Sequence, residues 1–142
     1  MNDDRQALVV VDAANVIGSR PNGWWRDRAG AARRLLASLT EYHQSLAVPH
    51  PVTVILEGQA RAAAPDPADH ATGDGQREAD GVEVVVAEGS GDDTIVDVVR
   101  RAADHEPARP ITVVTADRGL RARVEALGAT TVGPSWLWDR LP

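Results

Sequence analysis

Acidic residues follow each of four sequence stretches that are typical of buried β-strands. Residues 8–11 are followed by Asp12, residues 54–56 by Glu57, residues 82–87 by Asp92 and Asp93, and residues 111–115 by Asp117. Continuous apolar strands that alternate with helical segments indicate a parallel sheet covered on both faces. Because all strands of such a sheet point the same way, ligands bind beyond their carboxyl ends. We therefore expect the four acidic positions to lie along one edge of the molecule.

The alternation of strands and helices predicts an α/β fold of the Rossmann-like, doubly wound type. Three layers are expected, with a mostly parallel sheet of about five strands in the middle. Strands are predicted at about residues 7–11, 52–56, 82–87, 111–115 and 130–132, and helices at about 28–47, 92–105 and 118–127. A length of 142 residues suits a single domain, 1–142, with a core of its own.

The segment 58–80 is rich in Ala, Gly, Pro and Asp and shows no clear periodicity. It predicts a long connection, with a short helix over 59–64 as the alternative. After the last strand, Gly133 and Pro134 predict a turn into a terminal segment in which Trp136 and Trp138 pack against the fold.

The composition excludes several kinds of enzyme. The chain has no Cys, which removes disulfides, thiolate metal sites and Cys nucleophiles, and no Lys, which removes a phosphate-loop lysine. A net charge of −6 argues against broad coating of nucleic acid, although residues 18–34 hold five Arg and one acid. With no apolar signal region and no run of transmembrane length, we expect a soluble, cytoplasmic protein.

Carboxylates gathered at one edge point to a bound cation. Two carboxylates ~5 Å apart repel each other by ~3 kcal/mol at an effective dielectric constant near 20. Ligands that are all oxygen favour a hard divalent ion such as Mg²⁺ or Mn²⁺. Taken singly, Asp92 and Asp93 also suit a helix N-terminus, and Asp117 and Asp12 suit capping positions. The four together favour the metal site.

Three short motifs resemble the NYN domains of the PIN-like nuclease superfamily, and most of all their YacP-like branch. Residues 9–18 (VVVDAANVIG) resemble the opening D-x-x-N signature, 91–95 (GDDTI) a helix start, and 114–117 (VTAD) a strand end. The resemblance implies a Rossmann-like sheet and Mg²⁺- or Mn²⁺-dependent hydrolysis of RNA. It also implies that the core metal ligands are Asp12, Asp92 and Asp117, supported by Asp93 and Asn15.

Glu57 departs from the Asp that this family often has at the second strand end, and it is predicted as a fourth metal ligand. A bound ion would lower the pKa of a water molecule, which Asp93 or Glu57 would orient. Catalysis is thus assigned to Asp12, Asp92, Asp93 and Asp117.

Substrate binding is assigned to residues that suit an RNA strand, single-stranded or structured. Arg20, Arg26 and Arg118 are candidates to clamp phosphates. Asn15 is assigned to substrate binding as well, and it could tether the loop or orient Asp12 by hydrogen bonding. Trp24 or Trp25 is a candidate to stack on a base, the alternative being burial against the first long helix.

Two other functions are consistent with the same residues. One is a metal-dependent phosphohydrolase that acts on free nucleotides, and the other is a non-catalytic module that binds RNA or protein. The sequence does not decide between endonucleolytic and exonucleolytic cleavage.

Overall fold

The computed structural model describes residues 7–20, 23, 26–46, 50–58, 71–73, 76–79 and 82–142, with only the backbone described over 71–73 and 76–79. The strands are β1 Leu8–Asp12, β2 Val52–Leu56, β3 Ala71–Gly73, β4 Gln76–Ala79, β5 Val82–Val86, β6 Ile111–Val114 and β7 Thr130–Val132. The helices are α1 Ala13–Gly18, α2 Arg28–Ser45, α4 Gly91–His105, α5 Arg118–Glu125 and α6 Pro134–Trp138.

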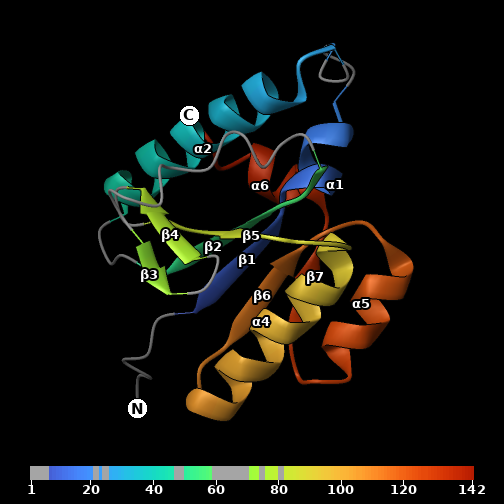
Figure 1. Cartoon of the computed structure of the whole chain (residues 1–142). Helices are drawn as coiled ribbons and strands as arrows, with labels where there is room; N and C mark the ends of the chain where they lie inside the picture. Colours follow the sequence, from blue (N-terminus) through green and yellow to red (C-terminus); the bar gives the residue numbers. More distant parts are fainter. Residues whose placement is uncertain are drawn as a thin grey trace.

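One sheet runs through the middle of the molecule in the order β3-β4-β5-β2-β1-β6-β7 (Figure 1). The five strands from β5 to β7 are parallel to one another, as predicted. β1 is central, with β2 and β6 as its neighbours. The carboxyl ends of β1, β2, β5 and β6 therefore point to the same edge.

The prediction that residues 58–80 form only a long connection was wrong, because the second half of this segment contains the strands β3 and β4. β3 and β4 form an antiparallel pair, and β4 extends the sheet by pairing antiparallel with β5. These strands have three and four residues, and the sequences ATG and QREA contain no apolar alternation. Their position depends on backbone pairing with β5, which a local pattern does not reveal. The alternative helix over 59–64 lies outside the described residues.

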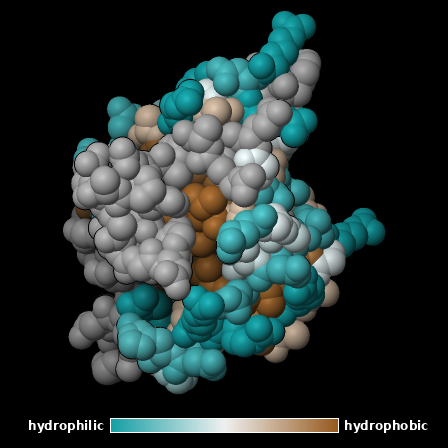
Figure 2. All heavy atoms as spheres, viewed as in Figure 1, coloured by the Kyte–Doolittle hydropathy of each residue, from teal (hydrophilic) through white to brown (hydrophobic). Residues whose placement is uncertain are grey.

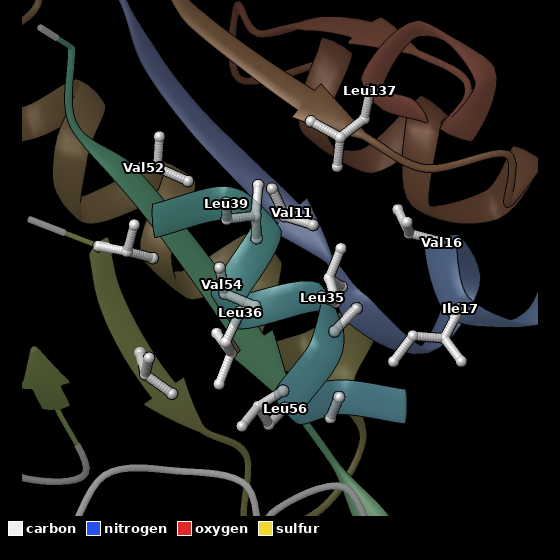
Figure 3. Close-up of a cluster of buried hydrophobic side chains, with 14 of the residues drawn as sticks. Val11, Val16, Ile17, Leu35, Leu36, Leu39, Val52, Val54, Leu56 and Leu137 are labelled. Atoms are coloured by element: carbon white, nitrogen blue, oxygen red, sulfur yellow. The ribbon is translucent and has the colours of Figure 1, made fainter. Parts of the chain in front are cut away.

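Two hydrophobic layers, one on each face of the sheet, confirm the three-layer architecture. α1, α2 and α6 cover one face, where Leu35, Leu36 and Leu39 pack against Val52 and Val54 of the sheet (Figure 3). On the other face, α4 and α5 pack on the alternate strand residues. Val, Leu, Ile and Ala fill both layers, as expected for a chain without Phe. In the view of Figure 2, hydrophilic residues cover much of the described surface around α4 and α5.

α4 follows the predicted pattern. Ile95, Val96 and Val99 are buried on one face of the helix, at the spacing that places side chains on a common stripe. Ser90 caps its N-terminus, and Glu106 follows its last residue.

Two short helices were not predicted. α1 follows β1 directly and is capped by Asp12, and α6 carries Trp136 and Trp138. Six and five residues give too few turns for a recognisable period. Within the described part of the chain, no helix is both long and apolar enough to cross a membrane.

Candidate metal-binding edge of the sheet

Asp12 is the most buried carboxylate of the candidate site. It ends the central strand and is 5% exposed. Its Oδ2 accepts a hydrogen bond from the Thr115 hydroxyl at 2.9 Å, and its Oδ1 accepts one from the Asn15 N–H at 3.3 Å. Burial, with smaller contributions from the charges of Asp92 and Glu57, raises the Asp12 pKa from 3.8 to about 6 despite these hydrogen bonds.

Thr115 connects two of the predicted acids. Its hydroxyl donates to Asp12 and also accepts the backbone N–H of Asp117 at 3.2 Å, and its side chain is completely buried. The sequence analysis did not assign Thr115 a role in the site. The only sequence signal was its place in the VTAD motif, because a threonine after a strand is otherwise unremarkable.

Asn15 connects the segment after β1 to the segment after β6. Its Oδ1 accepts the backbone N–H of Ala116 at 2.8 Å, and this bond links α1 to the connection between β6 and α5. The bond spans 101 positions of sequence. Asn15 was predicted to tether a loop or to orient Asp12 by hydrogen bonding, and it was also assigned to substrate binding. Its side-chain oxygen holds the loop that carries Asp117.

Asp117 lies at the start of α5. This position agrees with both predictions for Asp117, a helix cap and an acid that follows the strand over 111–115. Its Oδ1 caps the helix by accepting the Leu120 N–H at 3.0 Å, and the residue is exposed. Among the described residues, the Asp117 carboxylate accepts this one hydrogen bond, through Oδ1. Arg118, the next residue, is also exposed.

Asp92 and Asp93 occupy the first turn of α4 but face different neighbours. Burial raises the Asp92 pKa, and the negative charges of Asp117 and Glu57 raise it further, while Arg123 opposes them. Asp93 instead forms an ion pair with Arg123 of α5, with 3.1 Å between Oδ1 and Nη1. Asp92 therefore belongs electrostatically to the acidic edge, whereas Asp93 is held by an arginine.

Glu57 connects the end of β2 to α4. Its Oε2 accepts the N–H of Gly91, the first residue of that helix, at 3.0 Å. A Cβ atom at position 91 would lie 2.7 Å from Glu57 Oε1, so glycine allows this close approach.

We expect Glu57→Ala to be less stable than Glu57→Gln by about 1 kcal/mol, because only the glutamine keeps an oxygen that accepts the Gly91 N–H. Glu57→Gln also removes a charge that repels Asp12 and Asp92, so it should be at least as stable as the unmodified protein. Urea unfolding of the three proteins in EDTA tests this order. Equal stability of the two variants would show that the contact with α4 contributes nothing.

The chemistry of this edge fits a hard divalent cation. Asp12, Asp92, Asp117 and Glu57 supply only oxygen donors, and the pKa values of Asp12 and Asp92 rise partly through repulsion between these acids. Among the described residues, however, no three His, Cys, Asp or Glu side chains are grouped closely enough to hold one ion. Direct sharing of an ion by three carboxylates therefore stays a prediction.

Two of the predicted substrate-binding residues, Asn15 and Arg118, lie at this edge beside Asp12 and Asp117. Arg20 follows α1, and its guanidinium lies 4.4 Å from the centre of the Trp138 ring. Arg26 is exposed just before α2. Trp24 falls outside the described residues.

Comparison with known proteins shows a fold relationship. No family model and no curated protein matches the sequence. Among solved structures, a mutant of Rae1 (YacP) from Bacillus subtilis matches with a TM-score of 0.69 and 20% identity, over 94% of this chain and 74% of that chain. This chain has the Rae1 (YacP) fold. A second Rae1 crystal structure gives a TM-score of 0.65 and 19% identity, over 93% and 71% of the two chains.

The match to Rae1 confirms the predicted YacP-like fold. At this identity the likeness to Rae1 extends to the fold alone. The roles of individual residues therefore rest on the contacts described above.

Proposed function

We propose that this protein is a divalent-metal-dependent ribonuclease that hydrolyses RNA phosphodiester bonds at the acidic edge of its sheet. The observation that carries the proposal is the placement of Asp12, Glu57, Asp92 and Asp117 after neighbouring parallel strands that end at the same edge of the sheet. Burial raises the pKa of Asp12 to about 6, and the charges of Asp92 and Glu57 add to the rise. The NYN-like motifs and the Rae1 fold support the same function.

Asp12, Asp92 and Asp117 are the proposed metal ligands, with Glu57 as a fourth. A divalent ion bound there supplies an acidified water molecule and neutralises charge on the phosphate oxygens. Thr115 and Asn15 hold Asp12 and the Asp117 loop in place, so the ligands come from segments fixed before substrate arrives.

The remaining predicted residues have distinct proposed roles. Asp93 keeps Arg123 beside the start of α4, and Arg123 tempers the negative charge at Asp92. Arg118 is the proposed partner of a phosphate beside Asp117, and the exposure of both residues supports this role. The absence of Cys is consistent with direct attack by water in place of a covalent thiol intermediate.

The expected result is cleavage of single-stranded or loop RNA with Mg²⁺ or Mn²⁺ and none with EDTA. We expect Asp92→Asn to lower the rate by about 100-fold or more, because it removes a charge that acts directly on the ion. Asp97→Asn is the matched control, since Asp97 lies on the same helix and pairs with Arg100 and Arg101. Its activity should stay within about twofold.

The assay should offer single-stranded RNA, hairpin RNA, DNA and nucleoside triphosphates to the same protein. Rapid hydrolysis of triphosphates with every RNA left intact would favour the phosphohydrolase. RNA binding without any hydrolysis, in both metals, would favour the non-catalytic module.

A further inference from the structure

A hollow of about 200 Å³ lies between the helices that cover the α2 face of the sheet. Figure 3 shows Ile17 of α1 and Leu35 of α2 on this face, with Leu137 of α6 nearby. The lining residues are Ile17, Ala31, Arg34, Leu35, Ser38 and Trp138. The hollow thus has an apolar floor, an aromatic wall and one arginine.

The aromatic wall is held in place from two sides. The Trp138 Nε1–H donates to the Ser19 Oγ at 3.0 Å, and the Arg20 guanidinium lies over the ring at 4.4 Å. These contacts fix the indole plane before any ligand binds. They are not required to anchor α6, because Leu137 beside it is completely buried, whereas Trp138 is only partly buried.

Arg34 lines the hollow, and Arg20 lies over the ring of Trp138, another lining residue. Arg20 and Arg34 are both exposed, and neither forms an ion pair within the described part of the chain. α1 has six residues, so its axis is about 9 Å long. Asp12 caps one end of this helix and Ser19 the other, which places Arg20 one short helix away from the acidic edge.

We propose that this hollow is a subsite for one nucleobase of a single-stranded RNA, with Arg20 and Arg34 binding the flanking phosphates. The proposal rests on the proposed ribonuclease function and names how that site holds its substrate. A volume of 200 Å³ is below the ~300–1,000 Å³ of sites for drug-sized ligands, so it suits one flat ring. Aromatic walls and arginines are the usual partners of unpaired bases and their phosphates.

The test measures RNA binding in EDTA, so that its result does not depend on cleavage. Fluorescence anisotropy of a labelled single-stranded oligonucleotide is compared with that of versions carrying one abasic nucleotide at successive positions. We expect one position at which the loss of the base weakens binding about tenfold, the effect typical of one stacked base.

Ser38→Leu fills the hollow from a helix that tolerates leucine, and it leaves Trp138 in place. It should weaken binding of the intact oligonucleotide about tenfold and remove the sensitivity to the abasic position. Arg34→Ala should weaken binding and lower its salt dependence by about one phosphate contact. Arg33→Ala is the matched control, because Arg33 is exposed on the same helix and does not line the hollow.

The outcomes separate this proposal from the function on which it rests. RNA cleavage with an unchanged abasic profile in Ser38→Leu would overturn the subsite and leave the ribonuclease intact. Binding of adenosine or uridine monophosphate that Ser38→Leu abolishes, with no binding of oligonucleotides, would overturn the RNA strand as occupant. Base-dependent binding without cleavage would support the subsite while the ribonuclease proposal failed.

Discussion

Asp12→Asn is expected to lower metal-dependent RNA cleavage by about a thousandfold or more while leaving the fold intact. The substitution keeps the shape of the side chain and one oxygen that accepts the Thr115 hydroxyl. It replaces the oxygen that accepts the Asn15 N–H with an amide group and removes the charge at the end of the central strand. Electrostatic stabilisation by a fixed carboxylate and its ion accounts for most of the rate in such a site. The measurement is single-turnover cleavage with Mn²⁺, alongside circular dichroism of both proteins.

Although Asp12→Asn should lower activity, it should raise the stability of the folded protein at neutral pH. The pKa of Asp12 in the folded protein, about 6, is above its ordinary value of 3.8, so the folded state binds this proton more tightly than the unfolded chain. The resulting stabilisation is complete below pH ~4 and is lost as the pH rises through about 6. At pH 7 without metal, Asp12→Asn should therefore be more stable than the unmodified protein, by up to about 3 kcal/mol.

Urea unfolding in EDTA at pH 5 and pH 7 measures this effect. Asp12 should make the unmodified protein about 1 kcal/mol more stable at pH 5 than at pH 7, and this component should be missing in Asp12→Asn. Mn²⁺ should raise the melting temperature of the unmodified protein alone. A variant that unfolds at neutral pH would instead make Asp12 a structural cap of α1.

Thr115→Val is expected to cost about 1–3 kcal/mol of stability and to lower activity at pH 7 by about tenfold. Valine has nearly the shape of threonine, but it leaves Asp12 without its hydroxyl donor and the Asp117 N–H without its acceptor. In the unmodified protein, the hydrogen bond from Thr115 lowers the pKa of Asp12. The variant lacks this bond, so the pKa of Asp12 should be higher in it. The acid limb of the pH profile for kcat/KM should therefore move to higher pH.

Thr115→Ser is the control for this prediction, because serine retains the hydroxyl. Its pH profile should match that of the unmodified protein even if the missing methyl group reduces stability. If Thr115→Val lost activity equally at every pH, Thr115 would support the backbone of this edge without acting on Asp12.

Most of the parallel sheet could be predicted because its strands are continuous apolar runs. The sequences LVVVD and VTVIL are buried throughout, and three of the five residues of VEVVV are buried; such apolar runs make a central parallel strand recognisable. β3 and β4 have no such run, and their pairing with β5 is a matter of backbone hydrogen bonds. α1 was missed because its six residues are too few to show a helical period.

The sequence allowed us to predict which strand each acid of this edge follows, but not which residues its side chain contacts. The position of each acid after a strand follows from the topology, and the shifts of the Asp12 and Asp92 pKa values show that these acids influence one another. The partners of the side chains come from distant segments. Asp93 meets Arg123 of α5, Glu57 meets the first N–H of α4, and Thr115 meets Asp12 across 103 positions. Such pairs depend on how the helices dock on the sheet.

The two outer strands of the sheet are short, and this lowers the tendency of the protein to associate with itself through strand pairing. β3 and β7 have three residues each, so the rows of unpaired backbone groups at both borders are short. A strand from another molecule would gain only a few hydrogen bonds by adding to either border, which lowers the tendency to form intermolecular β-structure. The long apolar strands that would make good templates for aggregation are all interior to the sheet. A concentrated solution of this protein should therefore stay free of fibrils as long as the outer strands remain in place.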